Sequence, residues 1–476
     1  MASHVEIKKS VPIARNVDVL VAGAGIAGCN AAIAAARTGA KTMLIDRFGS
    51  LGGNMGPGLI GGGGVDCEMP VSLRINTPGV LGEFLSRCRQ HCDTTFLHHY
   101  FRDSEVISYV WLKMMEEENV ELMLNVYSAD PIMEGDDVKG LIVETKSGAL
   151  AIMAKVLIDT TGDADVAYRA GAPIYEGNVS CFEAGIYFAL GHVDVDRFHT
   201  QVLFKDPPQD VIDWGANIDP LVVWRYHCGS NKQLLPYQKK AWEAGDYKFI
   251  ETVPEYGNVR IIVDHGIFDS VVNHVPNPIS RDKYQIVGAM AGVYGVERAM
   301  VSGDVFVMTG LEVACRKYIF KTSKFLKKWM PGFEESYLHM ISPFFHARGG
   351  RSMISEYACT HEDTRENTVK DDVVFRYYGF PYSHKDVDFP YRQLLPQKIG
   401  NLLAAGRSAI IQGPCFRIRW MVFMMGNVAG AAAGLAVKNN VAPRELDVKE
   451  LQKVLYTEYQ LPFGDETRLR ELGLVT

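Results

Sequence analysis

The sequence predicts an α/β fold in which a Rossmann-type dinucleotide-binding domain is split by an α+β substrate domain. Three segments lead to this prediction. Residues 17–46, VDVLVAGAGIAGCNAAIAAARTGAKTMLID, have the order strand, glycine turn, helix, strand and acid. AKVLIDTTGDAD, from residue 154, is an apolar strand that ends in a polar turn. NLLAAGRSA, from residue 401, repeats that pattern ahead of a long apolar stretch.

The glycine turn of the first segment has the spacing of a dinucleotide fingerprint. Gly23 permits the tight turn, Gly25 lets the backbone approach a pyrophosphate, and Gly28 lets the helix lie against the strand. The helix is expected to begin near Ile26, so that its unpaired N–H groups and positive dipole end face that pyrophosphate. Asp46 ends the second strand, where a carboxylate accepts hydrogen bonds from a ribose diol.

A long glycine-rich loop, RFGSLGGNMGPGLIGGGG, follows at residues 47–64. A chain that runs along a ribityl-pyrophosphate to a flavin ring needs such a loop, whereas an NAD-only unit does not. The alternative is a flexible surface loop. The flavin interpretation is favoured by short strands expected at 122–126, 138–145 and 150–157, because the turn after them, Thr161-Gly162-Asp163, should return beside the cofactor.

The C-terminal part supplies the last expected strand, at residues 401–405, followed by Gly406 and Arg407. The alanine- and glycine-rich segment MGNVAGAAAGLAV then predicts a helix. The first turn of this helix could give N–H groups and positive potential to the N1–C2=O edge of a flavin, where negative charge gathers on reduction.

With these segments in place, the chain resembles the FAD-dependent oxidoreductases of the glutathione-reductase-like flavoprotein superfamily. Within that group it is most similar to the bacterial set labelled "FAD dependent oxidoreductase". The motifs that carry the resemblance, in the family's order, are GAGIAG, LGGN, IDTTGDAD, PGFEESYL, ISEYACTHED, FPYRQLLP, NLLAAGR and MGNVAGAAAGLA. The resemblance implies a glutathione-reductase-like FAD-binding domain, FAD as cofactor and an oxidoreductase activity.

The resemblance also implies cofactor contacts at both ends of the chain. Val126 would lie near the adenine, residues 161–163 along the ribityl chain, and Gly426 and Asn427 near the pyrimidine ring. The full set of implied FAD contacts is Gly23, Gly25, Gly28, Asp46, Arg47, Gly52, Gly53, Asn54, Val126, Thr161, Gly162, Asp163, Gly406, Arg407, Gly426 and Asn427. The chain departs from the family at Asn427, which is more often Gln, and at HARGGR, residues 346–351, where relatives have a denser arginine run. The family's substrate chemistry is therefore not carried over.

We expect the FAD-binding domain to occupy residues 14–172 and 331–440, with a substrate domain at 173–330 and a helical tail at 441–476. In the substrate domain, strands are expected at 185–190 and 259–263 and a helix at 284–300. Its aromatic and histidine side chains either line a cavity or belong to the core or surface; they are Trp214, Trp224, Tyr226, Trp242, His227, His265 and His274.

The catalytic candidates are Arg419, His346 and Arg351, on segments that the family brings to the flavin. An arginine could clamp a substrate carboxylate or stabilise an oxyanion. A histidine could take the proton that accompanies hydride transfer. The alternative is that the arginines anchor cofactor phosphate or pair with Glu356 and Asp363.

The leading functional hypothesis is hydride transfer between an organic small molecule and flavin N5. The sequence has no second strand–GxGxxG–helix unit, so electrons would come from the substrate, a transiently bound nicotinamide or another protein. A flavin monooxygenase is an alternative, which Gly406-Arg407 in place of a Gly-Asp pair disfavours. A flavin-bearing electron-transfer subunit is another, which the lack of iron–sulfur cysteine clusters disfavours.

Composition limits the partners. The chain has 476 residues and a net charge of −7, which argues against nucleic acid. Nine scattered cysteines indicate reduced thiols in a cytoplasm, and Cys88 and Cys92 read as helix-face residues rather than a metal site. No signal peptide is expected, and the apolar residues 420–437 are expected to be a buried helix rather than a membrane span. The expected partners are a small-molecule substrate and a separate electron acceptor or donor; a homo-oligomer is compatible.

Overall fold

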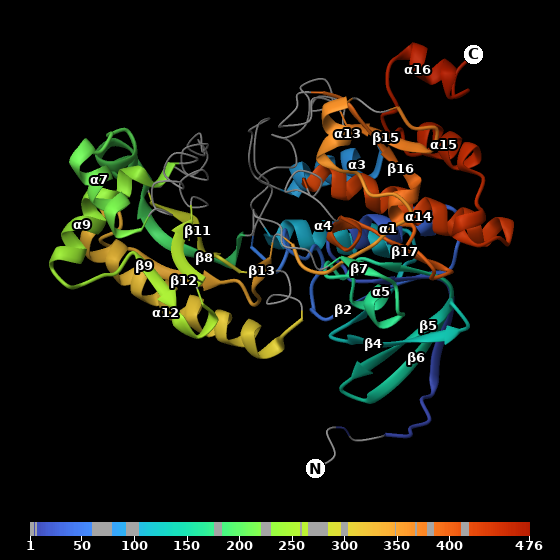
Figure 1. The fold of residues 1–476 in the computed structure, drawn as a ribbon, viewed down its shortest axis with the longest axis horizontal. Coiled ribbons are helices and arrows are strands. Elements are labelled where there is room, and N and C mark those ends of the chain that lie inside the picture. Colours follow the sequence, from blue (N-terminus) through green and yellow to red (C-terminus); the bar gives the residue numbers. More distant parts are fainter. Residues whose placement is uncertain are drawn as a thin grey trace.

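The structure is a computed structural model, drawn in Figure 1. It describes the chain outside residues 1–3, 5–6, 60–78, 92–103, 176–182, 220–229, 258, 265–283, 297–302, 348, 367–368, 378–384 and 411–417. The elements form two lobes, each around its own sheet, and the chain passes from the first lobe to the second and back.

The first sheet has seven strands and a parallel, Rossmann-like core. The parallel strands are β1 (Ile13–Ala22), β2 (Thr42–Asp46), β3 (Glu121–Leu124), β6 (Gly148–Asp159) and β17 (Leu402–Ala404). β5 (Asp137–Thr145) and β4 (Tyr127–Glu134) extend the sheet in antiparallel pairing. The strands expected at 122–126, 138–145, 150–157 and 401–405 are therefore present, close to their predicted ranges. Because parallel strands share one carboxyl edge, this edge is where a ligand would bind.

Two helices pack against each other over this sheet, α1 (Ile26–Arg37) and α14 (Arg419–Asn439). Glycines on α14 permit the close approach: a Cβ on Gly426 would lie 2.4 Å from the carbonyl oxygen of Ala27, and one on Gly430 2.1 Å from that of Ala31. α14 is long and apolar enough to cross a membrane, but 89% of its apolar window is buried inside the protein. It therefore occupies the position of a core helix, as expected.

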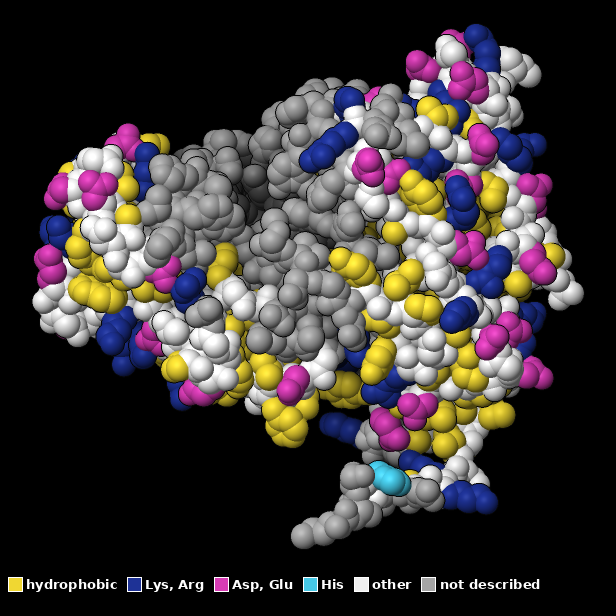
Figure 2. All heavy atoms as spheres, viewed as in Figure 1, with side chains coloured by type: hydrophobic (Ala, Val, Ile, Leu, Met, Phe, Trp, Pro, Cys, Tyr) yellow, Lys and Arg dark blue, Asp and Glu magenta, His cyan; other side chains and the backbone are white. Residues whose placement is uncertain are grey.

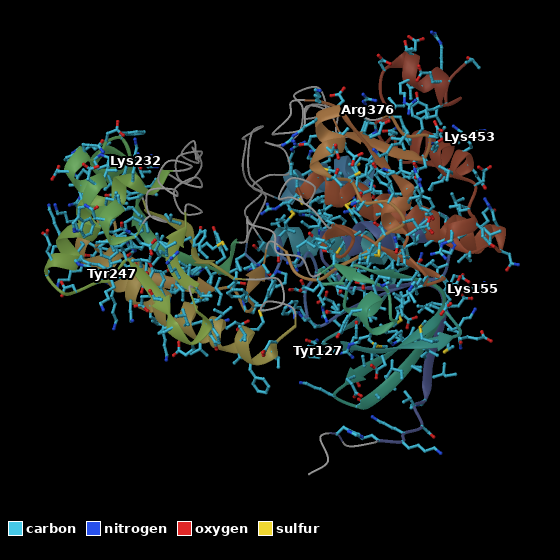
Figure 3. The ribbon with its side chains drawn as sticks, viewed as in Figure 1. Tyr127, Lys155, Lys232, Tyr247, Arg376 and Lys453 are labelled. Atoms are coloured by element: carbon cyan, nitrogen blue, oxygen red, sulfur yellow. The ribbon has the colours of Figure 1, made fainter. Side chains whose placement is uncertain are left out.

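The second sheet is antiparallel and has the order β12-β8-β11-β10-β9, with β13 paired to β8. Its strands are β8 (Glu183–Asp194), β9 (Ile250–Val253), β10 (Val259–Asp264), β11 (Tyr284–Tyr294), β12 (Tyr337–Ile341) and β13 (His346–Ala347). The long helix α12 (Val305–Trp329) packs against it. Tyr247, labelled in Figure 3, lies in this lobe. Its hydroxyl is 3.0 Å from that of Tyr318 and 2.7 Å from that of Thr322.

The remaining elements are α3 (Gly79–His91), α4 (Ser104–Glu117), α5 (Asp165–Arg169), β7 (Ile174–Tyr175), α6 (Val195–Phe198), α7 (Gln209–Ile218), α9 (Leu235–Glu243), β14 (Ser352–Met353), α13 (His361–Glu366), β15 (Val373–Tyr377), β16 (Val387–Pro390), α15 (Val448–Thr457) and α16 (Glu466–Glu471). Short helical turns separate several of them, among them η5 (Gly406–Ala409) directly after β17.

The helix predicted at residues 284–300 is wrong. Residues Tyr284–Tyr294 form β11, hydrogen-bonded to β8 on one side and β10 on the other. Both faces of this strand are covered, since residues 287–289 and 291–294 are all buried. A continuous apolar run does not distinguish a buried strand from a buried helix by its period, and pairing with two neighbouring strands decides for the strand.

The predicted domain boundary at residue 330 also needs correction. β12 and β13 lie within the range assigned to the FAD-binding domain, yet both pair with β8 of the second sheet. The two apolar cores agree: one draws residues from 17–172 and 353–472, the other from 184–345. A single sequence indicates where a strand forms but not which strand it pairs with, so this extension was not predictable.

Acidic and basic side chains are interspersed over both lobes on the face shown in Figure 2.

In the second lobe Trp214 and Trp242 lie edge to face, with ring centroids 6.2 Å apart, and both contact Phe249. These tryptophans are partly buried and pack against the core of the second lobe, away from the lining of the cavity described below. Cys88 is buried on α3, and Cys92 lies outside the described residues.

Candidate functional site

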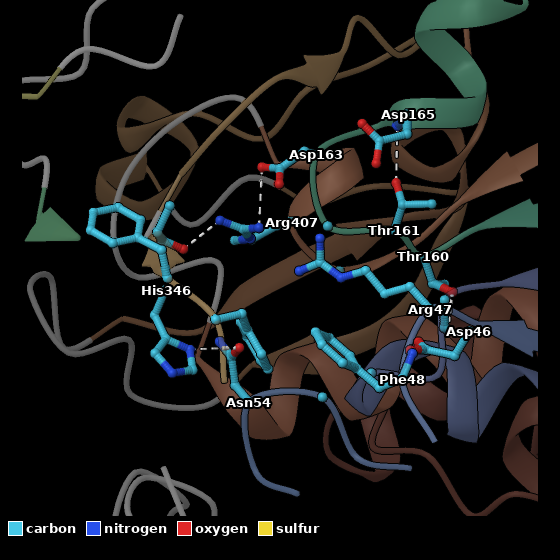
Figure 4. Close-up of a pocket in the computed structure, with 18 of the residues that line it drawn as sticks. Asp46, Arg47, Phe48, Asn54, Thr160, Thr161, Asp163, Asp165, His346 and Arg407 are labelled. Atoms are coloured by element: carbon cyan, nitrogen blue, oxygen red, sulfur yellow. Dashed lines mark hydrogen bonds and ion pairs between the residues drawn. The ribbon is translucent and has the colours of Figure 1, made fainter. Parts of the chain in front are cut away.

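A cavity of about 930 Å³ opens at the carboxyl edge of the first sheet and continues to the second sheet and α12 (Figure 4). The sequence-predicted residues that line it are Gly23, Gly25, Asp46, Arg47, Gly53, Asn54, Val126, Thr161, Gly162, Asp163, His346, Gly406, Arg407 and Arg419. From the second lobe, lining residues include Tyr187, Met290, Met308, Thr309, Glu312 and Phe344. The fold thus brings together residues that lie up to four hundred positions apart.

The glycine turn between β1 and α1 forms one end of the cavity. Gly23 has a φ of +107°, and a Cβ there would lie 2.5 Å from the carbonyl oxygen of Thr160. A Cβ on Gly28 would lie 1.7 Å from the carbonyl oxygen of Gly23, so glycine is needed for this close packing. At Gly25, by contrast, a Cβ would meet nothing within 4 Å. Gly25 is the N-cap of α1, no side chain caps the helix, and the first residues of the helix line the cavity. Their N–H groups and the positive end of the helix dipole can therefore bind an anion there.

Asp46 lies at the end of β2, as predicted. Its carboxylate accepts hydrogen bonds from the backbone N–H of Ala24 at 2.5 Å and of Phe48 at 2.7 Å. Burial raises the pKa of Asp46, and these two hydrogen bonds oppose that rise. Each carboxylate oxygen retains accepting capacity toward the cavity, which is the chemistry that a ribose diol requires.

Arg47, the residue after Asp46, lies over two aromatic rings. Its guanidinium carbon is 4.7 Å from the ring centroid of Phe48 and 5.5 Å from that of Phe344. The two rings are themselves stacked, with centroids 4.6 Å apart. Phe48 follows β2 and Phe344 precedes β13, so this contact joins the two lobes at the cavity wall.

Asp159, at the end of β6, holds the 161–163 turn in place. Its fully buried carboxylate accepts from the N–H and the hydroxyl of Thr161 at 3.0 and 2.7 Å, and from the N–H groups of Val166 and Ala167 at 3.0 and 2.9 Å. The Ser408 hydroxyl adds a fifth bond at 3.2 Å. Burial raises the pKa of Asp159, while these bonds favour the anion. The carboxylate therefore fixes the turn relative to both β6 and η5.

Arg407 closes the same wall from η5. It pairs with Asp163, donates to the carbonyl oxygen of Ala347, and lies over Gly162. The sequence placed Arg407 at the cofactor; the structure adds that it connects the 161–163 turn with β13 of the second sheet (Figure 4).

His346 is 4% exposed, and both of its ring nitrogens are engaged. Nδ1 lies 3.0 Å from Oδ1 of Asn54, and Nε2 lies 2.9 Å from the hydroxyl of Ser342. Burial lowers the pKa of His346 from 6.5 to about 3, and the positive charges of Arg407, Arg419 and Arg47 act in the same direction. The ring is therefore neutral near pH 7.

Some predicted contacts lie away from the cavity lining. α14 begins at Arg419, one residue before the apolar stretch expected to be helical, so Arg419 rather than Gly426 or Asn427 lies at its cavity end. Gly426 packs on α1 and Asn427 is fully buried within α14. Gly28 and Gly52 shape the backbone behind the lining. The physical reason is that Gly426 and Asn427 lie about two turns inside α14, where they pack within the protein and only the first turn reaches the cavity.

Arg351 also lies behind the cavity lining. Its guanidinium bonds Asp165 at 2.6 Å and lies over the ring of Tyr168 at 4.3 Å. These contacts favour the structural alternative for Arg351.

Other predicted candidates lie outside the described residues: His227, His265, His274, Trp224, Tyr226 and the arginine at 348. Within the described part of the chain, no group of three or more His, Cys, Asp or Glu side chains could hold a metal ion.

Sequence reasoning missed Asp159, Thr160 and Ser408. The Thr160 hydroxyl lies 2.9 Å from the carbonyl oxygen of Ala22 and 2.7 Å from that of Gly23. A hydrogen bond from this hydroxyl therefore stabilises the glycine turn. A carboxylate that ends an otherwise apolar strand, as in VLID, was the available signal for Asp159. No local signal marks Ser408.

The fold and cavity define a Rossmann-type dinucleotide-binding enzyme: an uncapped helix N-terminus, a glycine cradle with open space at Gly25, and a carboxylate at the end of β2. The chain belongs to the FAD dependent oxidoreductase family, whose sequence model matches residues 18–455. The cofactor is therefore FAD and the protein is an oxidoreductase, and the residues of the cradle fit an FAD pyrophosphate and ribose.

Among curated proteins, no sequence matches significantly. Solved structures with a similar fold include a geranylgeranyl bacteriochlorophyll reductase-like protein from Thermoplasma acidophilum, at 12% identity and TM-score 0.43, covering 94% of this chain and 84% of that one. A p-nitrophenol 4-monooxygenase from Pseudomonas putida matches at 11% identity and TM-score 0.44, covering 97% and 93%. Likenesses at this level do not define an activity.

Proposed function

We propose that the protein binds FAD non-covalently in this cavity and transfers a hydride between a small organic substrate and the flavin. The observation that carries the proposal is the continuity of a single cavity. It begins at the α1 N-terminus and Asp46, passes the 161–163 turn and Arg407, and reaches the second sheet and α12. FAD supplies the two-electron chemistry at N5 when it is bound; the protein supplies binding, orientation and electrostatics.

The cavity residues divide this work. The α1 N-terminus and the glycine cradle would hold the pyrophosphate, and Asp46 the ribose. Arg419 begins α14, so its charge adds to the positive end of that helix at the cavity. We assign Arg419 the role of stabilising negative charge that develops during the reaction.

The second lobe would provide the substrate contacts. Tyr187, Met290, Met308 and Thr309 line this part of the cavity together with the charged Asp304 and Arg316. They favour a substrate that has both an apolar part and polar groups. Glu312 also lies here, but one of its carboxylate oxygens already accepts from the N–H of Phe345 at 3.1 Å.

We further propose a glutathione-reductase-like arrangement, in which the FAD-binding domain is split by the substrate domain. The first core supports it, since it draws residues from both ends of the chain. A cytoplasmic location is supported by the thiols of Cys29, Cys315 and Cys359, which form no disulfide, because reduced thiols are typical of that compartment. The partners would be a small-molecule substrate and a separate electron acceptor or donor.

The test is an anaerobic titration of the purified protein. The visible spectrum should show bound flavin, and bleaching by members of a panel of alcohols and hydroxy acids, but not by NADH or NADPH, is the expected result. Bleaching by nicotinamides alone would contradict the proposal and favour a reductase or monooxygenase. Arg419→Ala should slow bleaching at least 10-fold while FAD affinity changes less than 3-fold, and Arg351→Ala serves as the control arginine behind the cavity. If Arg419→Ala instead loses FAD to the same extent, its role is structural.

A further inference from the structure

Residues 342–347, which comprise the connection after β12 and the short strand β13, contact both lobes. On the side of the second lobe, the N–H of Ser342 donates to the carbonyl oxygen of Tyr187 at 2.8 Å. The guanidinium of Arg316 donates to the Ser342 carbonyl oxygen at 3.1 Å, and Glu312 accepts from the N–H of Phe345. The backbone of this connection is therefore fixed by β8 and α12.

On the side of the first lobe, the same connection contacts the loop at residues 51–59. The ring of His346 lies against this loop so closely that a Cβ on Gly58 would be 2.7 Å from the ring carbon Cε1. Asn54 presents its amide oxygen to Nδ1. An amide oxygen only accepts, so Nδ1 carries the hydrogen and Nε2 is left as an acceptor.

Ser342 completes the arrangement. Its hydroxyl lies 2.9 Å from Nε2, nearer than the carbonyl oxygen of Phe344 at 3.2 Å, so Nε2 is the better acceptor for the hydroxyl hydrogen. The ring is thus neutral, buried and bonded at both ends, between residues 288 positions apart in the sequence.

We propose that His346 is a positioning residue that couples the second sheet to the FAD-binding loop through the chain of hydrogen bonds Ser342–His346–Asn54. The inference rests on the proposed function, since it takes Asn54 to lie along the flavin. It replaces the proton-transfer role that the sequence suggested for His346. Its consequence is that a change at Ser342, which does not itself line the cavity, reaches FAD through Asn54.

A double-mutant cycle on the full-length protein tests this coupling, with the FAD dissociation constant as readout. Ser342→Ala keeps the backbone bonds and removes only the hydroxyl. We expect it to weaken FAD binding about 5-fold in the otherwise unchanged protein, and less than 2-fold when Asn54→Ala is already present, because residues in one hydrogen-bond network are not additive. Equal effects of Ser342→Ala in both backgrounds, or no effect in either, would overturn the proposal.

A matched control is Ser336→Ala, another buried serine of the second lobe, whose hydroxyl donates only locally to the carbonyl oxygen of Phe333. It should leave FAD affinity within 2-fold. His346→Gln, which keeps a donor and an acceptor, should retain more FAD affinity than His346→Leu; the reverse order also contradicts the proposal. If the unchanged protein binds no FAD, the proposed function is wrong. If it binds FAD but the effects of Ser342→Ala and Asn54→Ala are additive, only the proposed coupling is wrong.

Discussion

The guanidinium of Arg407 and the carboxylate of Asp163 form an ion pair in the wall of the FAD cavity, with Nη2 and Oδ1 3.1 Å apart. Gly162 makes the pair possible. Its φ is +91°, and a Cβ there would lie 2.9 Å from the same Nη2 atom. Because Arg407 also donates to Ala347, this single side chain fixes the 161–163 turn against β13.

Gly162→Ala should therefore both strain the backbone and displace Arg407. We expect a loss of about 2–3 kcal/mol in the free energy of unfolding, together with weaker FAD binding. Gly148→Ala is the matched control, since Gly148 has a φ of +102° but nothing within 4 Å of a Cβ. Chemical denaturation and FAD titration of both variants check this. Equal losses of stability with unchanged FAD affinity would show that the Arg407 contact is unimportant.

Gly25→Val should remove FAD without unfolding the protein. Its φ of −72° suits any residue, and the new side chain would enter open space in the cavity. We expect a stability change of about 1 kcal/mol or less and at least a 100-fold loss of FAD affinity. Gly23→Ala should instead lose about 2–4 kcal/mol of stability, because its Cβ would meet the Thr160 backbone. If the Gly25→Val variant retains FAD, the proposal that the glycine turn binds the FAD pyrophosphate is wrong.

Asp159→Asn should be strongly destabilising. An amide has one accepting oxygen, so its NH₂ group would face N–H or hydroxyl donors that now bond the carboxylate. We expect a loss of about 3 kcal/mol, since buried donors are left unpaired. Asp130→Asn is the control, at a side chain that is 77% exposed, and should change stability by about 0.5 kcal/mol or less. Similar losses in both variants would contradict the role of Asp159.

His346 should contribute a pH dependence to stability. Its pKa is about 3 in the fold and 6.5 ordinarily, so the unfolded chain binds the proton more readily between these values. The contribution is present above pH 6.5 and is lost as the pH falls toward 3, by about 2 kcal/mol between pH 7 and pH 5. Denaturation curves at the two pH values should show a smaller decrement for His346→Gln than for the unchanged protein. An identical decrement would mean that His346 is not held neutral.

Local patterns predicted much of the first lobe. The glycine spacing at 23, 25 and 28, the carboxylate of Asp46 and the turn at 161–163 lie where the sequence placed them, because each follows directly from a strand or helix boundary. β11 was mistaken for a helix, since its small residues carry little β propensity and its burial depends on neighbours from elsewhere in the chain.

The sequence by itself determined the dinucleotide fingerprint, because it depends on spacings within about thirty residues. It also made FAD the expected cofactor, through separate motifs that each follow a short apolar strand and together resemble one family. Only the tertiary structure decided the environment of His346, the position of Arg351 behind the cavity and the anchoring role of Asp159. Each of these depends on contacts between segments far apart in the chain. The pKa and hydrogen-bond state of a side chain are set by burial and by its partners, and these exist only once the lobes are packed together.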